Sequence, residues 1–371
     1  MENCDVLIIG GGPAGSSCAW KLRQKGMDVV VMDKSVFPRD KVCAGWITPA
    51  VVDVLQLDIE DYSRNHVLQP ISSFRTGMIN GSEVETHYPD TVSYGIRRYE
   101  LDDYLLQRSG ARLRLGQPMN YLERRGNNWV VNDFISARLV IGAGGHFCPV
   151  ARFMGAQIGA DEPAIKAKEV EFKMNQLQKF ECQVSGDMPE LFFCEDLKGY
   201  GWCFRKGDYL NIGLGREDNH GLAEQLEHFC DFLKQHSKIP QDIPDRFHGH
   251  AYLLHGHGMR KQVADGMLLI GDAAGLAYPE SGEGIRPAVE SALLAAVTII
   301  EAAGDYRQAQ LQPYASRLIK RFGTNAESDS MMPQFLRNYI AGALLESKWF
   351  TRHVVLDRWF LHSRQQSLQV N

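Results

Sequence analysis

The pattern of apolar and polar positions at the start of the chain predicts a strand, a helix and a second strand. Residues 6–9 form an uninterrupted apolar run, which is typical of a buried strand. Small and apolar residues then recur at helical spacing, and Gly26 ends this helix before a second apolar run at residues 29–32. The result is a β-α-β unit, whose inward helix face is made of Ala14, Cys18, Ala19 and Leu22.

The rest of the chain adds two further patterns. Residues 267–270 form another apolar run of the buried-strand type, and a long apolar helix is expected from about residue 285. Short strands separated by turns fill residues 161–262, around one helix at residues 222–236. Asn80-Gly81 is a typical hairpin turn.

Three glycines occupy the turn between the first strand and the helix. Gly10, Gly12 and Gly15 match G-x-G-x-x-G: the first permits a tight turn, the second lets a pyrophosphate approach the backbone, and the third lets helix and strand pack closely. Asp33 ends the second strand, where an acid accepts hydrogen bonds from a ribose. The unit predicts binding of an ADP moiety and does not choose between FAD and NAD.

A second glycine-rich segment favours FAD. Asp272 follows the strand at residues 267–270, where its carboxylate can accept hydrogen bonds from the ribityl hydroxyls of a flavin. Gly282 and Gly284 form a turn that can bring backbone N–H groups to the isoalloxazine edge, and the following helix favours negative charge on a reduced flavin. The alternative is an ordinary strand, loop and helix, in which the acid is an N-cap.

With these motifs the sequence resembles the geranylgeranyl reductase family, within the flavoprotein hydroxylases and reductases of the p-hydroxybenzoate hydroxylase fold. The resemblance rests on blocks spread from residue 6 to about residue 300. Besides the glycine turn and the strand-terminal acid, the blocks are Pro38-Arg39-Asp40-Lys41-Val42-Cys43-Ala44-Gly45, then Arg98, Leu101, Asp102 and Leu105, the triplet Tyr200, Trp202 and Phe204, and Gly271-Asp272-Ala273-Ala274-Gly275 with Pro279 and Gly282-Glu283-Gly284-Ile285.

Three positions depart from the family pattern. Ala44 replaces the first of two glycines after the cysteine, and Arg205 replaces a proline after the aromatic triplet. Gly144 stands where the larger group has an acid that helps to bind FAD and pyridine nucleotide. The electron donor therefore stays open between NAD(P)H and a ferredoxin-like protein.

The resemblance implies an α/β fold, and the pattern of strands and helices agrees with it. The expected parts are a Rossmann-like FAD-binding domain, an antiparallel β-rich substrate domain and a helical C-terminal region. The FAD-binding domain is expected at residues 1–70, 98–160 and 263–305, the substrate domain at 71–97 and 161–262, and the helical region at 306–371.

The resemblance also implies which residues bind the cofactor. The residues expected to contact FAD are Gly10, Gly12, Pro13, Ala14, Gly15, Asp33, Lys34, Ala44, Gly45, Arg98, Asp272, Gly282, Gly284 and Ile285. For Arg98 the alternative is a surface salt bridge. Cys43 lies in a loop that runs along the flavin, where a thiol can position a substrate double bond or donate a proton to carbon. The alternative is that Cys43 only packs against FAD.

Aromatic residues mark the expected substrate site. Tyr200, Trp202 and Phe204 alternate along a strand and point to one face, where they can wall an apolar cavity. The alternative is an aromatic face buried in a sheet core. A second aromatic group lies among basic residues near the C-terminus; we expect it to pack on the protein, and a membrane interface is the alternative. This group comprises Trp349, Phe350, Trp359 and Phe360.

Composition and charge narrow the class of protein. The 371 residues are 44% apolar and 23% charged, as in ordinary globular proteins, and the net charge of −5 gives no electrostatic basis for nucleic-acid binding. Eight cysteines without a CxxC pair, and an N-terminus without a signal-peptide pattern, predict a cytoplasmic protein with reduced thiols. No metal site is expected, because the histidines read as a solvated strand edge. These are His248, His250, His255 and His257.

The motifs predict an FAD-dependent oxidoreductase, and the resemblance implies that it saturates C=C bonds of an apolar isoprenoid or lipid substrate by hydride transfer from reduced flavin. Two alternatives stay open. One is an FAD-dependent monooxygenase or halogenase of the same fold, and the other is a flavoprotein with a non-redox function, as a cyclase, an isomerase or a binding protein. A small apolar substrate is the expected partner, while a redox partner protein and peripheral contact with a membrane are left open.

Overall fold

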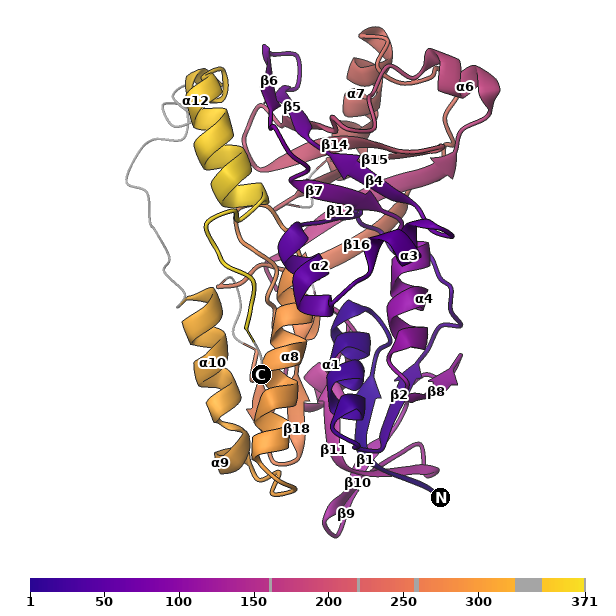
Figure 1. Ribbon diagram of the computed structural model, residues 1–371, viewed down its shortest axis with the longest axis vertical. Coiled ribbons are helices and arrows are strands. Elements are labelled where there is room, and N and C mark those ends of the chain that lie inside the picture. Colours follow the sequence, from indigo (N-terminus) through magenta and orange to yellow (C-terminus); the bar gives the residue numbers. More distant parts are fainter. Residues whose placement is uncertain (160–161, 219–220, 257–259, 324–341, 370–371) are drawn as a thin grey trace.

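A computed structural model describes residues 1–159, 162–218, 221–256, 260–323 and 342–369. The half of the molecule that holds the N-terminus is built on an eight-stranded sheet in the order β17-β18-β11-β1-β2-β8, with β10 and β9 added beside β11 (Figure 1). The strands are β1 (Glu2–Ile9), β2 (Val29–Asp33), β8 (Arg112–Leu115), β9 (Leu122–Arg125), β10 (Asn128–Val131), β11 (Ile135–Gly142), β17 (Val263–Ala264) and β18 (Met267–Leu269).

The central strands of this sheet form because their apolar runs are buried on both faces. Leu7 and Ile8 in β1 and Val30 in β2 have no exposed surface, as expected for parallel strands covered by helices. The strands predicted at residues 6–9 and 29–32 are confirmed, with β1 beginning earlier than the apolar run.

Helices α1 (Pro13–Gln24), α4 (Arg98–Arg108) and α8 (Ile285–Glu301) pack together, with α1 in contact with both others (Figure 1). A Cβ atom at Gly15 would overlap the carbonyl oxygen of Gly10, so only a glycine lets α1 approach β1 this closely. Gly10 itself has φ +117°, a left-handed conformation that other residues rarely adopt.

The other half of the molecule is built on a seven-stranded sheet in the order β16-β12-β15-β14-β13-β5-β6. Neighbouring strands are antiparallel, except that β13 and β5 are parallel. The predicted hairpin turn at Asn80-Gly81 connects β5 and β6. The strands are β5 (Ser73–Met78), β6 (Glu83–His87), β12 (Ala164–Lys173), β13 (Glu190–Phe193), β14 (Gly199–Lys206), β15 (Tyr209–Arg216) and β16 (His248–Leu253).

The two faces of this second sheet have different neighbours. Helix α7 (Leu222–Gln235) covers one face, where Cys203 of β14 packs with Phe229. Trp202 and Phe204, on either side of Cys203, belong to a different cluster that includes Trp46. The alternation predicted for β14 is therefore confirmed, and the aromatic face looks away from α7.

Short elements join the two sheets. A small sheet has three strands in the order β3-β7-β4. Its strands come at the points where the chain passes from the first large sheet to the second and back again. Helix α2 contacts α8. The remaining elements are β3 (Trp46–Ile47), β4 (Leu68–Ile71), β7 (Ser93–Ile96), α2 (Pro49–Leu55), α3 (Ile59–Ser63), α5 (Pro149–Phe153), α6 (Gln176–Glu181) and the 3₁₀ helix η1 (Gly271–Ala274).

The described part of the C-terminal region contains helices, as predicted, and ends in a non-helical segment at residues 361–369. It contains α9 (Gln308–Leu311), α10 (Pro313–Phe322), α12 (Lys348–Phe350) and the π-helix η2 (Thr351–Phe360). Residues 324–341, part of the predicted region at 306–371, lie outside the described residues. The packing predicted for the C-terminal aromatic group holds for Phe360, whose ring lies 5.7 Å from that of Trp46. It is wrong for Trp349, which is 67% exposed.

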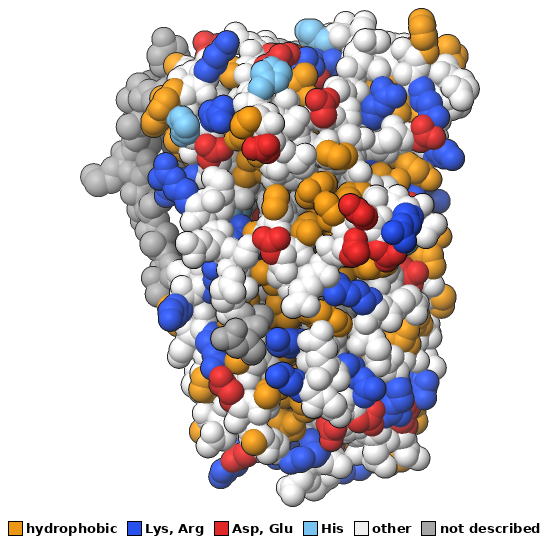
Figure 2. Space-filling model, viewed as in Figure 1, with side chains coloured by type: hydrophobic (Ala, Val, Ile, Leu, Met, Phe, Trp, Pro, Cys, Tyr) orange, Lys and Arg blue, Asp and Glu red, His pale blue; other side chains and the backbone are white. Residues whose placement is uncertain are grey.

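The surface carries both signs of charge. Figure 2 shows acidic and basic side chains interspersed over one face, without a large area of a single sign. Within the part of the chain that the structure describes, no helix is long and apolar enough to cross a membrane.

Candidate active site

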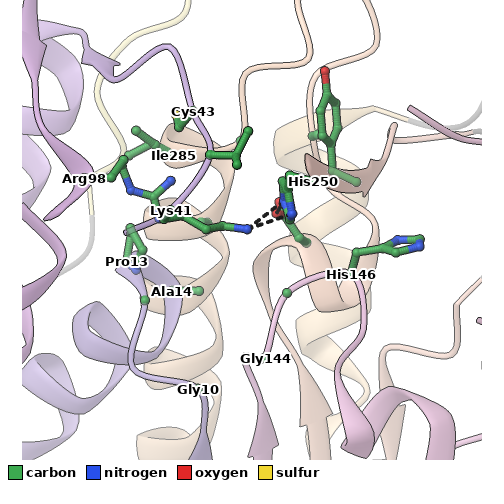
Figure 3. Close-up of a pocket in the computed structure, with 18 of the residues that line it drawn as sticks. Gly10, Pro13, Ala14, Lys41, Cys43, Arg98, Gly144, His146, His250 and Ile285 are labelled. Atoms are coloured by element: carbon green, nitrogen blue, oxygen red, sulfur yellow. Dashed lines mark hydrogen bonds and ion pairs between the residues drawn. The ribbon is translucent and has the colours of Figure 1, made fainter. Parts of the chain in front are cut away.

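A cavity of about 630 Å³ lies where the two sheets meet, which is within the usual size range of ligand sites. Its lining comes from both halves of the molecule, including Gly10 after β1, Gly144 after β11 and His250 on β16 (Figure 3). Of the residues predicted to contact FAD, all except Gly15 line this cavity. Gly15 lies behind the turn, where it packs α1 against β1.

The glycine turn and Asp33 form one end of the cavity. Asp33 accepts hydrogen bonds from the backbone N–H groups of Gly11, at 2.7 Å, and Ser35, at 2.8 Å. These bonds hold the carboxylate at the end of β2, next to the N-terminus of α1. Because backbone N–H groups at a helix N-terminus favour anions, this end of the cavity suits the ADP part of a dinucleotide.

Arg39 supplies an unpaired donor at the same end. One guanidinium nitrogen lies 3.1 Å from Asp102, while Nη1 is buried and has no hydrogen-bond partner among the residues that the structure describes. A buried N–H group without a partner is costly, and an anionic oxygen in the cavity would satisfy it. This orphaned donor, together with the glycine turn, fits the pyrophosphate of FAD.

Arg98 forms a buried ion pair within α4. Its Nε and Nη2 donate to the two carboxylate oxygens of Asp102, at 2.7 and 2.8 Å. Burial favours a lower pKa for Arg98, but the Asp102 carboxylate outweighs it and holds the pKa above the ordinary value. The surface salt bridge considered for Arg98 is therefore wrong. The residue lines the cavity, and its contact with FAD stays a prediction.

Cys43 is the cysteine that lies open to the cavity. Of the eight cysteines, all of which fall in described residues, it is the one that is not buried. Its Sγ accepts a hydrogen bond from the Gly45 N–H at 3.4 Å and also interacts with the Arg98 guanidinium. By contrast, burial raises the pKa of the Cys148 thiol above its ordinary value. Only the Cys43 thiol is thus exposed to whatever fills the cavity.

A buried polar network lies beneath the Cys43 loop, and it was not predicted from the sequence. Asn211 of β15 donates to the carbonyl oxygen of Cys43 at 3.2 Å and to Glu169 at 3.3 Å, and it accepts from Nε1 of Trp202 at 2.8 Å. Burial raises the pKa of Glu169 to about 8, so its carboxyl group is mostly protonated at neutral pH. The network ties the loop to the aromatic strand β14.

A buried lysine supports the same loop at Gly45. Nζ of Lys206 donates to the carbonyl oxygen of Ile96 at 2.9 Å and pairs with Glu171 at 2.8 Å. Gly45 has φ +72°, and a Cβ there would come within 2.5 Å of Nζ. Residue 45 therefore has to be glycine for both conformational and steric reasons.

Lys41 and His250 lie on opposite walls of the cavity and meet across it (Figure 3). The carboxylate of Asp272 lines the same cavity. Nε2 of His250 lies 2.7 Å from Nζ of Lys41 and 3.9 Å from Oδ2 of Asp272. Burial favours a higher pKa for Asp272, but the hydrogen bond with His250 and the charge of Lys41 bring the pKa below its ordinary value. The predicted solvated strand edge is wrong for His250, because β16 turns this side chain into the cavity, while His248 is exposed.

Of the other two histidines in the predicted strand edge, the structure describes one. His255 lies in the described chain, where Nε2 lies 3.3 Å from the carbonyl oxygen of Gly323, and His257 falls outside the described residues. Among the residues that the structure describes, no group of three or more His, Cys, Asp or Glu side chains is arranged to hold a metal ion.

The turn at Gly282 and Gly284 forms the cavity wall before α8. Gly282 has φ +67°, and a Cβ there would overlap the hydroxyl of Tyr252. Gly284 is the N-cap of α8, and a Cβ there would come within 3.1 Å of Oδ1 of Asp272. Both glycines therefore let the backbone approach the cavity closely.

The aromatic triplet lines the cavity and is also part of a core. Trp202 and Phe204 are buried, and the hydroxyl of Tyr200 donates to the carbonyl oxygen of Ser281 at 2.5 Å. Phe360 from the C-terminal segment adds a further wall, with its ring 5.3 Å from that of Tyr200. The triplet therefore lines the cavity and also belongs to a buried core, while its contact with a substrate stays a prediction.

The loop after β11 contains Gly144, at the position where an acid was expected from the larger group of flavoproteins, and a different polar group lies beside it. Gly144 lines the cavity, and His146 next to it lies 3.2 Å from a guanidinium nitrogen of Arg260. Arg260 in turn pairs with Glu162 at 2.7 Å. Burial and the Arg260 charge lower the pKa of His146, so it is neutral at neutral pH.

Known oxidoreductases are similar to this chain in sequence. Residues 5–77 match the model of the FAD-dependent oxidoreductase family. The menaquinone reductase of Mycobacterium tuberculosis is 29% identical over 80% of this chain and 76% of its own length. The digeranylgeranylglycerophospholipid reductase of Methanocaldococcus jannaschii is 26% identical over 84% of this chain and 81% of its own length.

Solved structures share the fold. A geranylgeranyl bacteriochlorophyll reductase-like protein from Thermoplasma acidophilum superposes with a TM-score of 0.74 at 22% identity, over 93% of this chain and 88% of its own. The flavin-dependent halogenase CmlS superposes with a TM-score of 0.66 at 22% identity, over 94% of this chain and 71% of its own.

These similarities, taken with the cavity, define the class of protein. The chain is an enzyme, an FAD-dependent oxidoreductase. Its cofactor is FAD. The sequence is similar to reductases of digeranylgeranyl lipids, in agreement with the resemblance that the motifs indicated.

Proposed function

We propose that this oxidoreductase saturates C=C bonds of an apolar isoprenoid or lipid substrate. One observation carries the proposal: a single cavity joins the glycine turn after β1 to a chamber walled by Trp202, Phe204 and Phe360. A cofactor bound at the turn and an apolar chain bound in the chamber would meet inside the protein. The names of relatives that reduce menaquinone and a digeranylgeranyl lipid support an isoprenoid substrate.

The cofactor end of the cavity is proposed to orient FAD, which supplies the hydride when bound. Asp33 is proposed to accept from the ribose and Asp272 from the ribityl chain, while Arg39 meets a phosphate oxygen with its free Nη1. The turn at Gly282 and Gly284 is proposed to approach the ring with backbone N–H groups.

The substrate end is proposed to bind an apolar chain by burial of surface. Trp202, Phe204, Leu191 and Ala167 contribute apolar wall, and Phe360 closes it from the C-terminal side. Each buried methylene of a substrate contributes about 0.8 kcal/mol. A polyprenyl chain therefore gains enough from burial to bind without a charged anchor.

Cys43 is proposed to donate the proton that completes the reduction. The thiol lies in the cavity wall, and the network through Asn211 fixes its loop relative to Trp202. Hydride addition to one alkene carbon leaves the other carbon to take a proton, so a positioned acid in the wall fits the chemistry.

A monooxygenase or halogenase function is the second candidate, because the halogenase CmlS shares the fold. These functions require oxygen to react with reduced flavin. Oxygen consumption that rises on adding substrate, with an oxygen atom or halide in the product, would favour them over alkene reduction.

Contact with a membrane surface is a further part of the proposal. Trp349 is 67% exposed, Leu344 is 39% exposed, and Lys348 lies between them in sequence. An aromatic residue beside a basic one is typical of the membrane interface. Sedimentation with anionic vesicles should fall for Trp349→Ala and stay unchanged for Leu177→Ala, an exposed apolar residue on α6.

The experiment for the proposed reaction uses anaerobic, chemically reduced enzyme with polyprenyl lipids. Mass spectrometry should show products heavier by two hydrogens per reduced bond. Comparison of NADPH with reduced ferredoxin as the electron source would then identify the donor. Lipids of unchanged mass, with flavin that stays reduced, would overturn the proposal.

A further inference from the structure

Glu283 is a buried carboxyl group in the cavity wall that forms no ion pair with any residue the structure describes. It is 8% exposed and lies between the two glycines of the turn before α8. Its Oε1 accepts a hydrogen bond from the N–H of Arg286 at 3.1 Å, which fixes the carboxyl group at the helix N-terminus. Its Oε2 is buried and has no hydrogen-bond partner within the described part of the chain.

The nearest guanidinium does not neutralise this carboxyl group. Arg286 directs Nε to Glu290 at 3.0 Å and Nη2 to the carbonyl oxygen of Gln365 at 2.7 Å, on the C-terminal segment. Two other carboxylates in the cavity wall do have polar or charged partners. Asp272 lies beside Lys41 and His250, and Asp33 accepts hydrogen bonds from two backbone N–H groups.

Among the described residues, the other titratable groups that interact with Glu283 do not supply a positive charge. They are Glu290 on the same helix, Tyr200 on β14 and Tyr278 before the turn. Burial therefore raises the pKa of Glu283 to about 7, although the backbone bond and the charge of Arg286 act in the opposite direction. Near neutral pH the group can gain or lose a proton with little free-energy change.

We propose that Glu283 takes up a proton when the flavin is reduced. The inference rests on the proposed placement of the flavin ring beside the Gly282–Gly284 turn, but not on the identity of the substrate. Two electrons and one proton enter the cofactor, and a second proton from solvent binds to Oε2 of Glu283. Negative charge on a reduced flavin would disfavour a neighbouring carboxylate in this low-dielectric site, so the proton is held until the cofactor is reoxidised.

The free oxygen distinguishes this proposal from a purely structural helix cap. A capping carboxylate needs one oxygen, and Oε1 performs that function. A glutamine at position 283 would keep the acceptor for the Arg286 N–H while removing the titration. Glu283→Gln is therefore the informative variant. Glu280→Gln is its matched control, since Glu280 is exposed and lies in the same loop.

The test is the midpoint potential of bound FAD as a function of pH, measured on the holoenzyme without substrate. For the wild type the slope below about pH 7 should correspond to one proton per two electrons, because Glu283 is protonated in both redox states. Above pH 7 the slope should double, because oxidised enzyme has lost the Glu283 proton and reduced enzyme keeps it. Glu280→Gln should behave like the wild type.

Glu283→Gln should keep the one-proton slope at all pH values. Its potential should equal that of the wild type below pH 7 and exceed it above. A wild-type slope of one proton from pH 5.5 to 9 would overturn the proposal whether or not the variant folds. A doubled slope that persists in Glu283→Gln would do the same.

An infrared difference spectrum of anaerobic photoreduction at pH 8 gives a second readout. The wild type should gain a protonated carboxyl band on reduction, and Glu283→Gln should not. A separate measurement tests the flavin placement: Asp272→Asn should weaken FAD binding. If Asp272→Asn binds FAD more weakly, as expected, but the wild type shows no carboxyl band, the Glu283 inference is rejected. The proposed cofactor site and reaction then stay intact.

Discussion

Nζ of Lys41 lies 2.7 Å from Nε2 of His250, and this contact joins two walls of the cavity (Figure 3). The residues are 209 positions apart in the chain. Burial lowers the pKa of Lys41 to about 8 and that of His250 to about 4. At neutral pH the lysine is therefore mostly cationic and the imidazole neutral, so the ammonium group donates to the ring.

This lysine predicts a pH dependence of FAD affinity. An anionic cofactor favours protonated Lys41, so above about pH 8 binding has to be accompanied by proton uptake. Affinity should stay level between pH 6.5 and 7.5 and fall as the pH rises above 8, by at most about tenfold per pH unit. Fluorescence titration of apoprotein with FAD measures this dependence.

Lys41→Met serves as the test variant for that dependence, and Lys34→Met as its control, because Lys34 lines the cavity but is exposed. The loss of affinity above pH 8 should disappear in Lys41→Met and remain in Lys34→Met. An equal pH dependence in wild type and Lys41→Met would assign the titration to another group.

Asp33→Ala should weaken FAD binding about ten- to a hundredfold. A hydrogen bond to a charged acceptor contributes about 1.5–3 kcal/mol, and this variant also frees the N–H groups of Gly11 and Ser35. Asp28→Ala is the control, because Asp28 directly precedes β2, which Asp33 ends, and pairs with Arg112 on the surface. An unchanged FAD dissociation constant in Asp33→Ala would remove Asp33 from the cofactor site.

Trp202→Phe separates the wall function of the aromatic triplet from its packing function. Phenylalanine keeps an apolar wall but leaves Oδ1 of Asn211 without its donor, which should lower the free energy of unfolding by about 1–3 kcal/mol. Trp202→Ala should lower it by about 3–5 kcal/mol, because it also leaves a void. Urea unfolding of both variants gives these values.

The same variants should differ in turnover. Trp202→Phe should retain FAD and raise the KM for an apolar substrate, while Trp129→Phe, in the other sheet, should leave KM unchanged. Normal KM in a folded, FAD-containing Trp202→Phe protein would make Trp202 a core residue only.

Cys43→Ala should slow product formation while the rate of flavin reduction stays normal. Loss of a positioned proton donor typically costs about a hundred- to ten-thousandfold in rate. Cys43→Ser should also be slow, because a hydroxyl is a much weaker acid than a thiol. Cys148→Ser is the control, because Cys148 is a buried cysteine in the loop between β11 and α5. Comparable single-turnover rates in wild type and Cys43→Ala would move the proton donor to another group.

The local motifs of this fold could be predicted from the sequence because their physical requirements are local. The Gly10 turn needs a left-handed φ, and Asp33 needs only to end the next strand. The alternation of Trp202 and Phe204 follows directly from strand geometry, and the structure agrees with it.

Long-range partners could not be predicted in this way. Asn211 meets Cys43 across 168 positions, and Lys206 meets Ile96 across 110, with no periodic pattern that links them. His250 was assigned to solvent because alternation along a strand defines two faces without saying which one borders a cavity. That choice depends on how β16 pairs with β12 and on the sheet beneath it.

The most direct test of the proposed reaction is anaerobic mixing of pre-reduced enzyme with a polyprenyl substrate, followed by flavin absorbance and product mass in the same reaction. The account predicts that flavin is reoxidised without oxygen, at a rate that rises with substrate concentration. It also predicts one C=C bond saturated per FAD reoxidised. Flavin that stays reduced until oxygen is admitted, with a product that then carries oxygen, would contradict the account.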